Sequence, residues 1–149
     1  MDKDRALRDH LLQLLKGESA HVSLEAVLRD FPIENFNKQI DGSHTAWELL
    51  EHIRIAQWDI LDFSTNPGYK EMSWPDDYWP KEPGTKASWN GSVKRVLDDL
   101  QSVRDLVADK NTDLFATIPH GNGQTILREV LLVADHNAYH LGQLVLRRK

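Results

Sequence analysis

The chain has 149 residues, of which 40% are apolar and 28% are charged, and its formal net charge at pH 7 is −5. This length and balance fit one soluble globular domain, residues 1–149, and exclude a disordered or fibrous chain. The absence of cysteine excludes a disulfide framework and a cysteine zinc site. The acidic charge argues against nucleic-acid binding, and no apolar segment is long enough to span a bilayer. We therefore expect a cytoplasmic protein with neither a nucleic-acid nor a membrane partner.

The first predicted elements are a long helix and a short one. Residues 2–16 carry leucines at helical spacing, and Gly17 follows as a typical helix-ending residue. The short helix follows Ser23 and ends before Pro32. No segment of the chain alternates with the period of a β-strand, so the sequence predicts an all-α protein built as a four-helix bundle.

The second long helix begins at a predicted capping box. Thr45 and Glu48 have the required spacing, and the apolar pattern continues to about Phe63. The third long helix is predicted from about Ser88 to Asp109, with valine and leucine along one stripe.

A long loop, residues 66–87, joins these two helices and contains four prolines. Loops of this length in a compact domain are usually functional or tightly packed. Trp74, Tyr78 and Trp79 lie within it. Two interpretations remain open: the rings cover one end of the bundle or a dimer contact, or they form the wall of a substrate pocket.

The fourth long helix is predicted from Thr125 to the end of the chain, after a glycine-rich turn. A helical projection places its apolar residues on one buried arc and His136 and His140 at the border of that arc. The predicted arc consists of Leu127, Val130, Leu131, Ala134, Ala138, Leu141 and Val145.

Three histidines are candidates for one metal site. His136 and His140 are four residues apart, so on a helix they share a face and can bind the same ion. His52 occupies the corresponding border of the second long helix. If the two helices are neighbours, the three imidazoles form a site with open positions, as catalytic zinc sites do. A fourth ligand would close the site, and His10 is the residue to check; seam packing without metal is the alternative.

Carboxylates on the same helix borders are candidate catalytic residues. Asn137 follows His136, so the glutamate of the H-E-x-x-H metalloproteases is missing and a base must come from elsewhere. Glu48, Asp59 and Glu129 are the candidates. Each of them is equally well explained as a solvated carboxylate or as a partner that orients an imidazole.

The segments 43–52 and 134–143 resemble the DinB/YfiT-like superfamily, a group of metal-binding four-helix-bundle proteins. The helix order and the Trp- and Pro-rich central loop agree with this resemblance. It implies that His52 is the first metal ligand and that His136 and His140 are the H-x-x-x-H pair. It also implies a cytoplasmic homodimer that binds nickel, zinc or a similar divalent ion.

The resemblance leaves the reaction open. Family members include S-transferases that use an external thiol such as bacillithiol or mycothiol, a thiol-dependent isomerase and metal-dependent hydrolases. We expect a metal-dependent thiol S-transferase acting on a small-molecule substrate. The alternatives are a hydrolase that uses metal-activated water and a non-catalytic metal-binding module for stress response.

Overall fold

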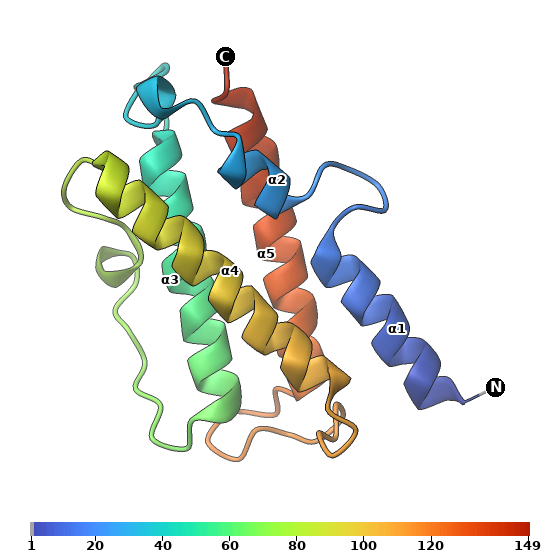
Figure 1. Ribbon diagram of the computed structural model, residues 1–149. Coiled ribbons are helices and arrows are strands. Elements are labelled where there is room, and N and C mark those ends of the chain that lie inside the picture. The colour runs from blue at the N-terminus through green and yellow to red at the C-terminus, as the bar shows by residue number, and fades with distance from the viewer. Residues whose placement is uncertain (1) are drawn as a thin grey trace.

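The computed structural model describes residues 2–149 and is all-α, as predicted. Figure 1 shows α3 and α5 side by side, α4 crossing them and α1 along the other flank. The helices are α1 (Lys3–Lys16), α2 (Leu24–Arg29), α3 (Ala46–Thr65), α4 (Lys86–Ala108) and α5 (Ile126–Leu146), with two 3-10 turns, η1 (Ile33–Asn35) and η2 (Asp76–Tyr78). The four long helices are those predicted from the sequence.

Side-chain caps set where the helices begin. The predicted capping box of Thr45 and Glu48 is present at the start of α3. A second box starts α4 at Lys86, two residues before the predicted start, because Thr85 is the cap and Ser88 returns its hydrogen bond. α5 ends at Leu146 rather than at the end of the chain.

The core consists of two apolar clusters, one near each end of the bundle. The first joins α2 with the beginnings of α3 and α4 and the end of α5. The second joins α1 with the end of α4 and the beginning of α5. Each cluster therefore ties together segments that are far apart in the sequence, and their burial is the main stabilising contribution to the fold.

A chain of polar side chains separates the two clusters. The Nε2 of Gln57 donates to the carbonyl oxygen of Val96 at 2.8 Å, and the Nδ2 of Asn137 donates to the Oε1 of Gln57 at 2.8 Å. Gln57 and Asn137 are 1% and 8% exposed. These hydrogen bonds connect α4, α3 and α5. Along α3 and α5, Gln57 and Asn137 each lie between residues of the first cluster and residues that belong to the second cluster or pack against it.

The buried surface of α5 differs from the predicted arc. Leu131 is 44% exposed, and Ala138 is also exposed. Val133 and Leu144, which the projection leaves outside the arc, are fully buried instead. The reason is that α5 packs against α1, α2 and α3, so its buried surface extends around more of the helix than a single arc predicts.

Arg8 fixes the N-terminal helix to the far end of α4. Its Nη1 donates to the carbonyl oxygens of Val107 at 2.8 Å and Asp109 at 3.0 Å, and its Nη2 donates to that of Thr112 at 2.8 Å. The Nε of Arg8 donates to the Oδ2 of Asp4 at 2.8 Å. The carbonyl groups at a helix C-terminus lack partners within the helix, and a buried cation satisfies them.

Within residues 2–149, none of the helices combines the length and the apolar character that crossing a bilayer requires.

Candidate metal centre

His52, His136 and His140 lie together where α3 and α5 pack side by side. One nitrogen from each ring lies within 4.8 Å of the corresponding nitrogen of the other two. His52 and His140 are 4% and 7% exposed, and His136 is partly buried. The two helices are therefore neighbours, as the proposed site requires.

Hydrogen bonds orient two of the three rings. The Nδ1 of His52 lies 2.9 Å from the carbonyl oxygen of Tyr78, and the Nδ1 of His140 lies 2.6 Å from the Oε1 of Gln143. Both oxygens only accept, so each Nδ1 carries the proton. The Nε2 of each ring then keeps its lone pair for a metal ion, and the oxygen partner holds the ring in place.

His136 completes a donor set that fits a divalent ion. Its Nε2 lies 3.1 Å from the Nε2 of His52, close to the about 3.4 Å that separates two nitrogens on a tetrahedral zinc ion. Its Nδ1 is buried without a hydrogen-bond partner. Three imidazole nitrogens suit zinc and nickel equally, so the residues present fit either ion.

The environment keeps all three imidazoles neutral at pH 7. Burial and the neighbouring imidazoles of His140 and His52 lower the pKa of His136 to about 4. Burial also lowers the pKa of His52, outweighing its hydrogen bond to Tyr78, and that of His140, outweighing its bond to Gln143. Neutral imidazole is the form that binds metal ions, so the site needs no deprotonation before binding.

The long loop packs against the histidines and also against the start of α3, at one end of the bundle. Trp79 stacks on His52 with ring centroids 4.0 Å apart, and His44 stacks on Trp79 at 3.8 Å. Trp74, which is 67% exposed, lies 6.2 Å from the His52 ring. The loop thus supplies the Tyr78 carbonyl that orients His52 and the Trp79 ring that shields one of its faces.

A polar pocket of about 480 Å³ lies farther along α3 and α5, and none of the three clustered histidines lines it. Tyr78 forms part of its wall, and so does Leu132, one helical turn before His136. The pocket has room for a small-molecule substrate. Its polar lining includes Asp59, Tyr69, Tyr78, His120, Arg128 and Glu129.

Two of the three predicted catalytic carboxylates lie in this pocket. Asp59 accepts hydrogen bonds from the hydroxyl groups of Tyr69 at 2.9 Å and Tyr78 at 2.7 Å. Burial and the Asp59 carboxylate raise the pKa of both phenols, so they stay protonated and donate. Glu129 is 3% exposed and accepts from Arg128 at 2.6 Å.

The remaining candidates lie outside the pocket and the cluster. Glu48 accepts from the amide of Thr45 at 2.8 Å and lies 3.2 Å from the Nδ1 of His44, so the structure gives it a capping role. His10 is exposed on α1, so it does not close the site. Within residues 2–149, the cluster contains three possible ligands and no fourth histidine or carboxylate.

Sequence reasoning assigned no role to Gln143 or Tyr69. Gln143 follows His140 by three residues on the same helix, a spacing that brings side chains together and could have identified it. Tyr69 has no comparable signal, because its contact with Asp59 depends on the path of the loop.

Comparison with known proteins identifies the family of the chain and a similar fold. The sequence matches the family model described as the DinB superfamily over residues 6–144. The fold is similar to the crystal structure of a protein assigned to the DinB family from Exiguobacterium sibiricum, with a TM-score of 0.58 and 19% sequence identity, over 99% of this chain and 90% of that one. At this identity the likeness shows the fold alone. No curated protein matches the sequence.

Proposed function

Since the chain belongs to the DinB superfamily, we propose that it is a metal-dependent enzyme of the thiol S-transferase type, which binds nickel or zinc through His52, His136 and His140. The observation that carries the proposal is the convergence of three neutral imidazoles from α3 and α5, with one nitrogen of each ring within 4.8 Å of the other two. A site with three protein ligands and open positions is typical of catalytic zinc, whereas structural zinc has four.

When a divalent ion is bound there, it lowers the pKa of a thiol or water molecule and so supplies a nucleophile at neutral pH. The chain contains no cysteine, so a thiol substrate must come from outside. Tyr78 and Gln143 hold the His52 and His140 rings in the orientation that metal binding requires. Trp79 covers one face of His52 and keeps water from it.

Asp59 is the carboxylate best placed to receive a proton from a substrate in the pocket. The two tyrosine hydroxyl groups hold it in position, and a carboxylate oxygen accepts more than one hydrogen bond. Glu129 is already engaged by Arg128, and both line the same pocket. We therefore assign Asp59 the proton-accepting role and Glu129 the role of holding Arg128.

A thiol-dependence assay tests the proposal. Zinc- and nickel-loaded protein is incubated with an electrophile, 1-chloro-2,4-dinitrobenzene or monobromobimane, in the presence and absence of bacillithiol, cysteine or glutathione. We expect thioether formation above the uncatalysed rate that disappears when the metal is removed. Turnover that persists in metal-free protein contradicts the proposal.

Hydrolysis is the second candidate, because a water molecule fits the same open positions. It predicts cleavage of esters, amides or lactones by the metal-loaded protein without any added thiol. Activity in this second assay alone would replace the transferase assignment. Absence of activity in both assays, with metal bound, favours a non-catalytic metal-binding module.

A further inference from the structure

The polar pocket of about 480 Å³ carries more negative than positive charge in its wall. Three carboxylates line it, those of Asp59, Glu71 and Glu129, together with one guanidinium, that of Arg128. Arg128 pairs with Glu129 at 2.6 Å. Among residues 2–149, neither Asp59 nor Glu71 forms an ion pair with a lysine, an arginine or a histidine. Two negative charges of the wall therefore lack a compensating cation.

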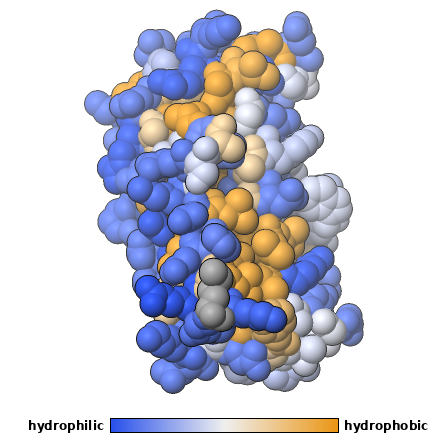
Figure 2. Space-filling view, turned by 90° about the vertical axis from the view of Figure 1, so that its right-hand side faces the viewer, coloured by the Kyte–Doolittle hydropathy of each residue, from blue (hydrophilic) through white to orange (hydrophobic). Residues whose placement is uncertain are grey.

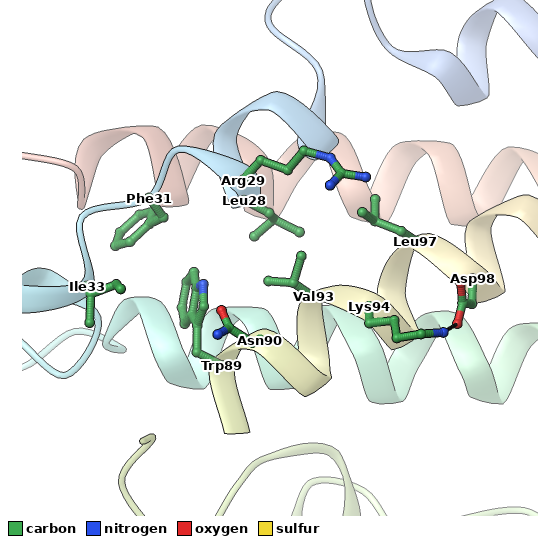
Figure 3. Close-up of a pocket in the computed structure, with 10 residues that line it drawn as sticks. All are labelled: Leu28, Arg29, Phe31, Ile33, Trp89, Asn90, Val93, Lys94, Leu97 and Asp98. Atoms are coloured by element: carbon green, nitrogen blue, oxygen red, sulfur yellow. Dashed lines mark hydrogen bonds and ion pairs between the residues drawn. The ribbon is translucent and has the colours of Figure 1, made fainter. Parts of the chain in front are cut away.

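Two other hollows of the molecule have their carboxylates paired. The groove of about 450 Å³ between α2 and α4 is lined by aromatic and aliphatic side chains, and the carboxylate in its wall pairs with Lys94, as Figure 3 shows. A pocket of about 110 Å³ lies beside the end of α1, on the side of the molecule that Figure 2 faces. Its carboxylates pair as well, Glu18 with Lys16 and Glu25 with Arg29. The uncompensated charge distinguishes the polar pocket from both.

Aromatic rings form part of the wall of the polar pocket. They belong to Phe63, Tyr69, Tyr78 and His120. The hydroxyl groups of Tyr69 and Tyr78 both donate to Asp59, so the carboxylate lies between two residues of the wall. Burial is the largest cause of the raised pKa of both phenols, and the charges of Asp59 and Glu71 raise it further. Glu71 therefore acts on the same two hydroxyl groups that bind Asp59.

The carboxylates of the pocket do not form a metal site. Among residues 2–149, three possible metal ligands lie within 4.8 Å of one another only at the three histidines. Asp59, Glu71 and Glu129 are therefore too far apart to share one ion. Separated carboxylates beside aromatic rings suit an organic cation instead, because the rings and the negative charges both attract it.

We propose that this pocket binds the primary ammonium group of a small organic molecule, with Asp59 and Glu71 supplying the opposite charge. Each Asp59 oxygen receives one hydrogen bond from a tyrosine and can accept another, so an ammonium N–H can donate to it. The body of the molecule packs against the aromatic rings. An anion would be repelled by the two unpaired carboxylates, and a neutral molecule would gain little from their charge.

The proposal names the chemical class of the substrate, and in that respect it rests on the proposed function. Asp59 follows His52 by seven residues on α3, so a substrate held in the pocket would carry its amino group about 10 Å along the helix from the histidines. Tyr78 connects the two places, because its carbonyl group bonds to His52 and its hydroxyl group to Asp59. Binding is measured without turnover, so the two proposals can fail separately.

Phenylethylamine and phenylethanol provide a matched pair of probes, because they differ only in the replacement of the ammonium group by a hydroxyl, and phenylpropanoate supplies an anion. Ligand-observed NMR at about pH 7 measures binding to the full-length protein. We expect the amine to bind with a dissociation constant of about 1 mM or lower, the alcohol at least about fivefold more weakly and the anion not at all. An amine can also coordinate zinc, so its affinity is measured in zinc-loaded and metal-free protein and should be the same in both.

Two substitutions of Glu71 locate the binding. Glu71→Gln should weaken amine binding by about 3- to 10-fold and Glu71→Lys should abolish it. Glu71 is exposed, so both variants should fold. The matched control is Glu34→Lys, because Glu34 is an exposed glutamate on η1 outside the pocket, and this variant should retain amine binding.

Three outcomes would overturn the proposal. They are equal binding of the amine and the alcohol, amine binding that survives Glu71→Lys, and an equal loss in Glu34→Lys, which would assign the attraction to net charge. Thiol-dependent turnover in a protein that binds no amine would refute this inference alone. Amine binding in a protein without metal-dependent turnover would refute the proposed function alone.

Discussion

The Nε2 atoms of His52 and His136 lie 3.1 Å apart, although 84 positions separate the two residues in the chain. Burial in the folded protein holds these nitrogens at that separation, and it also keeps both rings neutral. Because the proton of His52 lies on Nδ1, the neutral His136 ring donates its Nε2–H to the Nε2 lone pair of His52 when no ion is bound. A shared divalent ion replaces this hydrogen bond and uses the lone pairs of both rings.

Replacing His136 by alanine should remove the metal. Wild-type protein purified without a chelating tag is expected to contain about one equivalent of zinc or nickel by elemental analysis, because the site supplies three ligands. His136→Ala should bind the same ion more than about 100-fold more weakly. The control is His10→Ala, since His10 is exposed on α1. Equal metal content in both variants would reduce the histidines to packing residues.

Gln143→Leu should weaken zinc binding by about 10- to 100-fold without abolishing it. The substitution keeps the volume of the side chain but leaves the Nδ1 of His140 without its oxygen partner. Competition with a chromophoric chelator measures the affinity. Gln101→Leu is the matched control, because Gln101 is exposed on α4 and bonds to Asp105. An unchanged affinity in Gln143→Leu would show that the ring needs no such support.

Acid should destabilise the metal-free protein. All three histidines have lowered pKa values in the folded state, so between about pH 6.5 and pH 4 the unfolded chain binds more protons. Their contribution to stability is complete above the unfolded pKa and is lost as the pH falls. Urea denaturation should therefore give a lower unfolding free energy at about pH 5 than at about pH 7.

A variant assigns this pH dependence to the cluster. His136→Asn removes the group whose pKa falls to about 4, so its unfolding free energy should change less with pH. His10→Asn should behave like the wild type. A decrease of the same size in His136→Asn would assign the acid sensitivity to other groups.

Asp59 and Glu48 should respond differently to substitution. Asp59→Asn should lower the turnover number at least about 100-fold with metal still bound, because the pocket loses its proton acceptor. Glu48→Ala should lower the unfolding free energy by about 0.5–1 kcal/mol and leave the turnover number nearly unchanged, because it removes half of a capping box. The reverse pattern would move the catalytic role to Glu48.

Arg8→Met should destabilise the protein by about 2–4 kcal/mol, because three backbone oxygens lose a buried cationic donor. Thermal or urea unfolding measures the change. Arg5→Met is the control on the same helix, since the Arg5 side chain is 82% exposed and its substitution should change stability by less than about 0.5 kcal/mol. A small effect of Arg8→Met would mean that water replaces the guanidinium.

The helices were predictable because their signals are local. Thr45 with Glu48 marks the start of α3, and Gly17, with its φ of 73°, marks the end of α1. The histidine cluster was predictable for the same reason, since each residue had to lie on a helix border and the two helices had to be neighbours. The three histidines that lie together in the structure are the three that the sequence predicts.

The polar chain and the loop contacts were not predictable in this way. Gln57 and Asn137 bury their amides only because the third helix offers the Val96 carbonyl, which depends on tertiary packing. The stacking of Trp79 on His52 depends on the path of the long loop. The homodimer, the cytoplasmic location and the identity of the catalytic carboxylates stay predictions.

The polar chain also bears on how the bundle loses structure. Apolar contacts join the helices in each of the two clusters, whereas between the clusters α3 and α5 are joined by the hydrogen bond between the amides of Gln57 and Asn137. Each half of the molecule can then open as its own cooperative unit, with slow and fast hydrogen exchange divided near Gln57. His52 and His140 lie beside residues of the first cluster on α3 and α5, so an ion bound there would join these two helices in that half and slow its hydrogen exchange more than that of the other half.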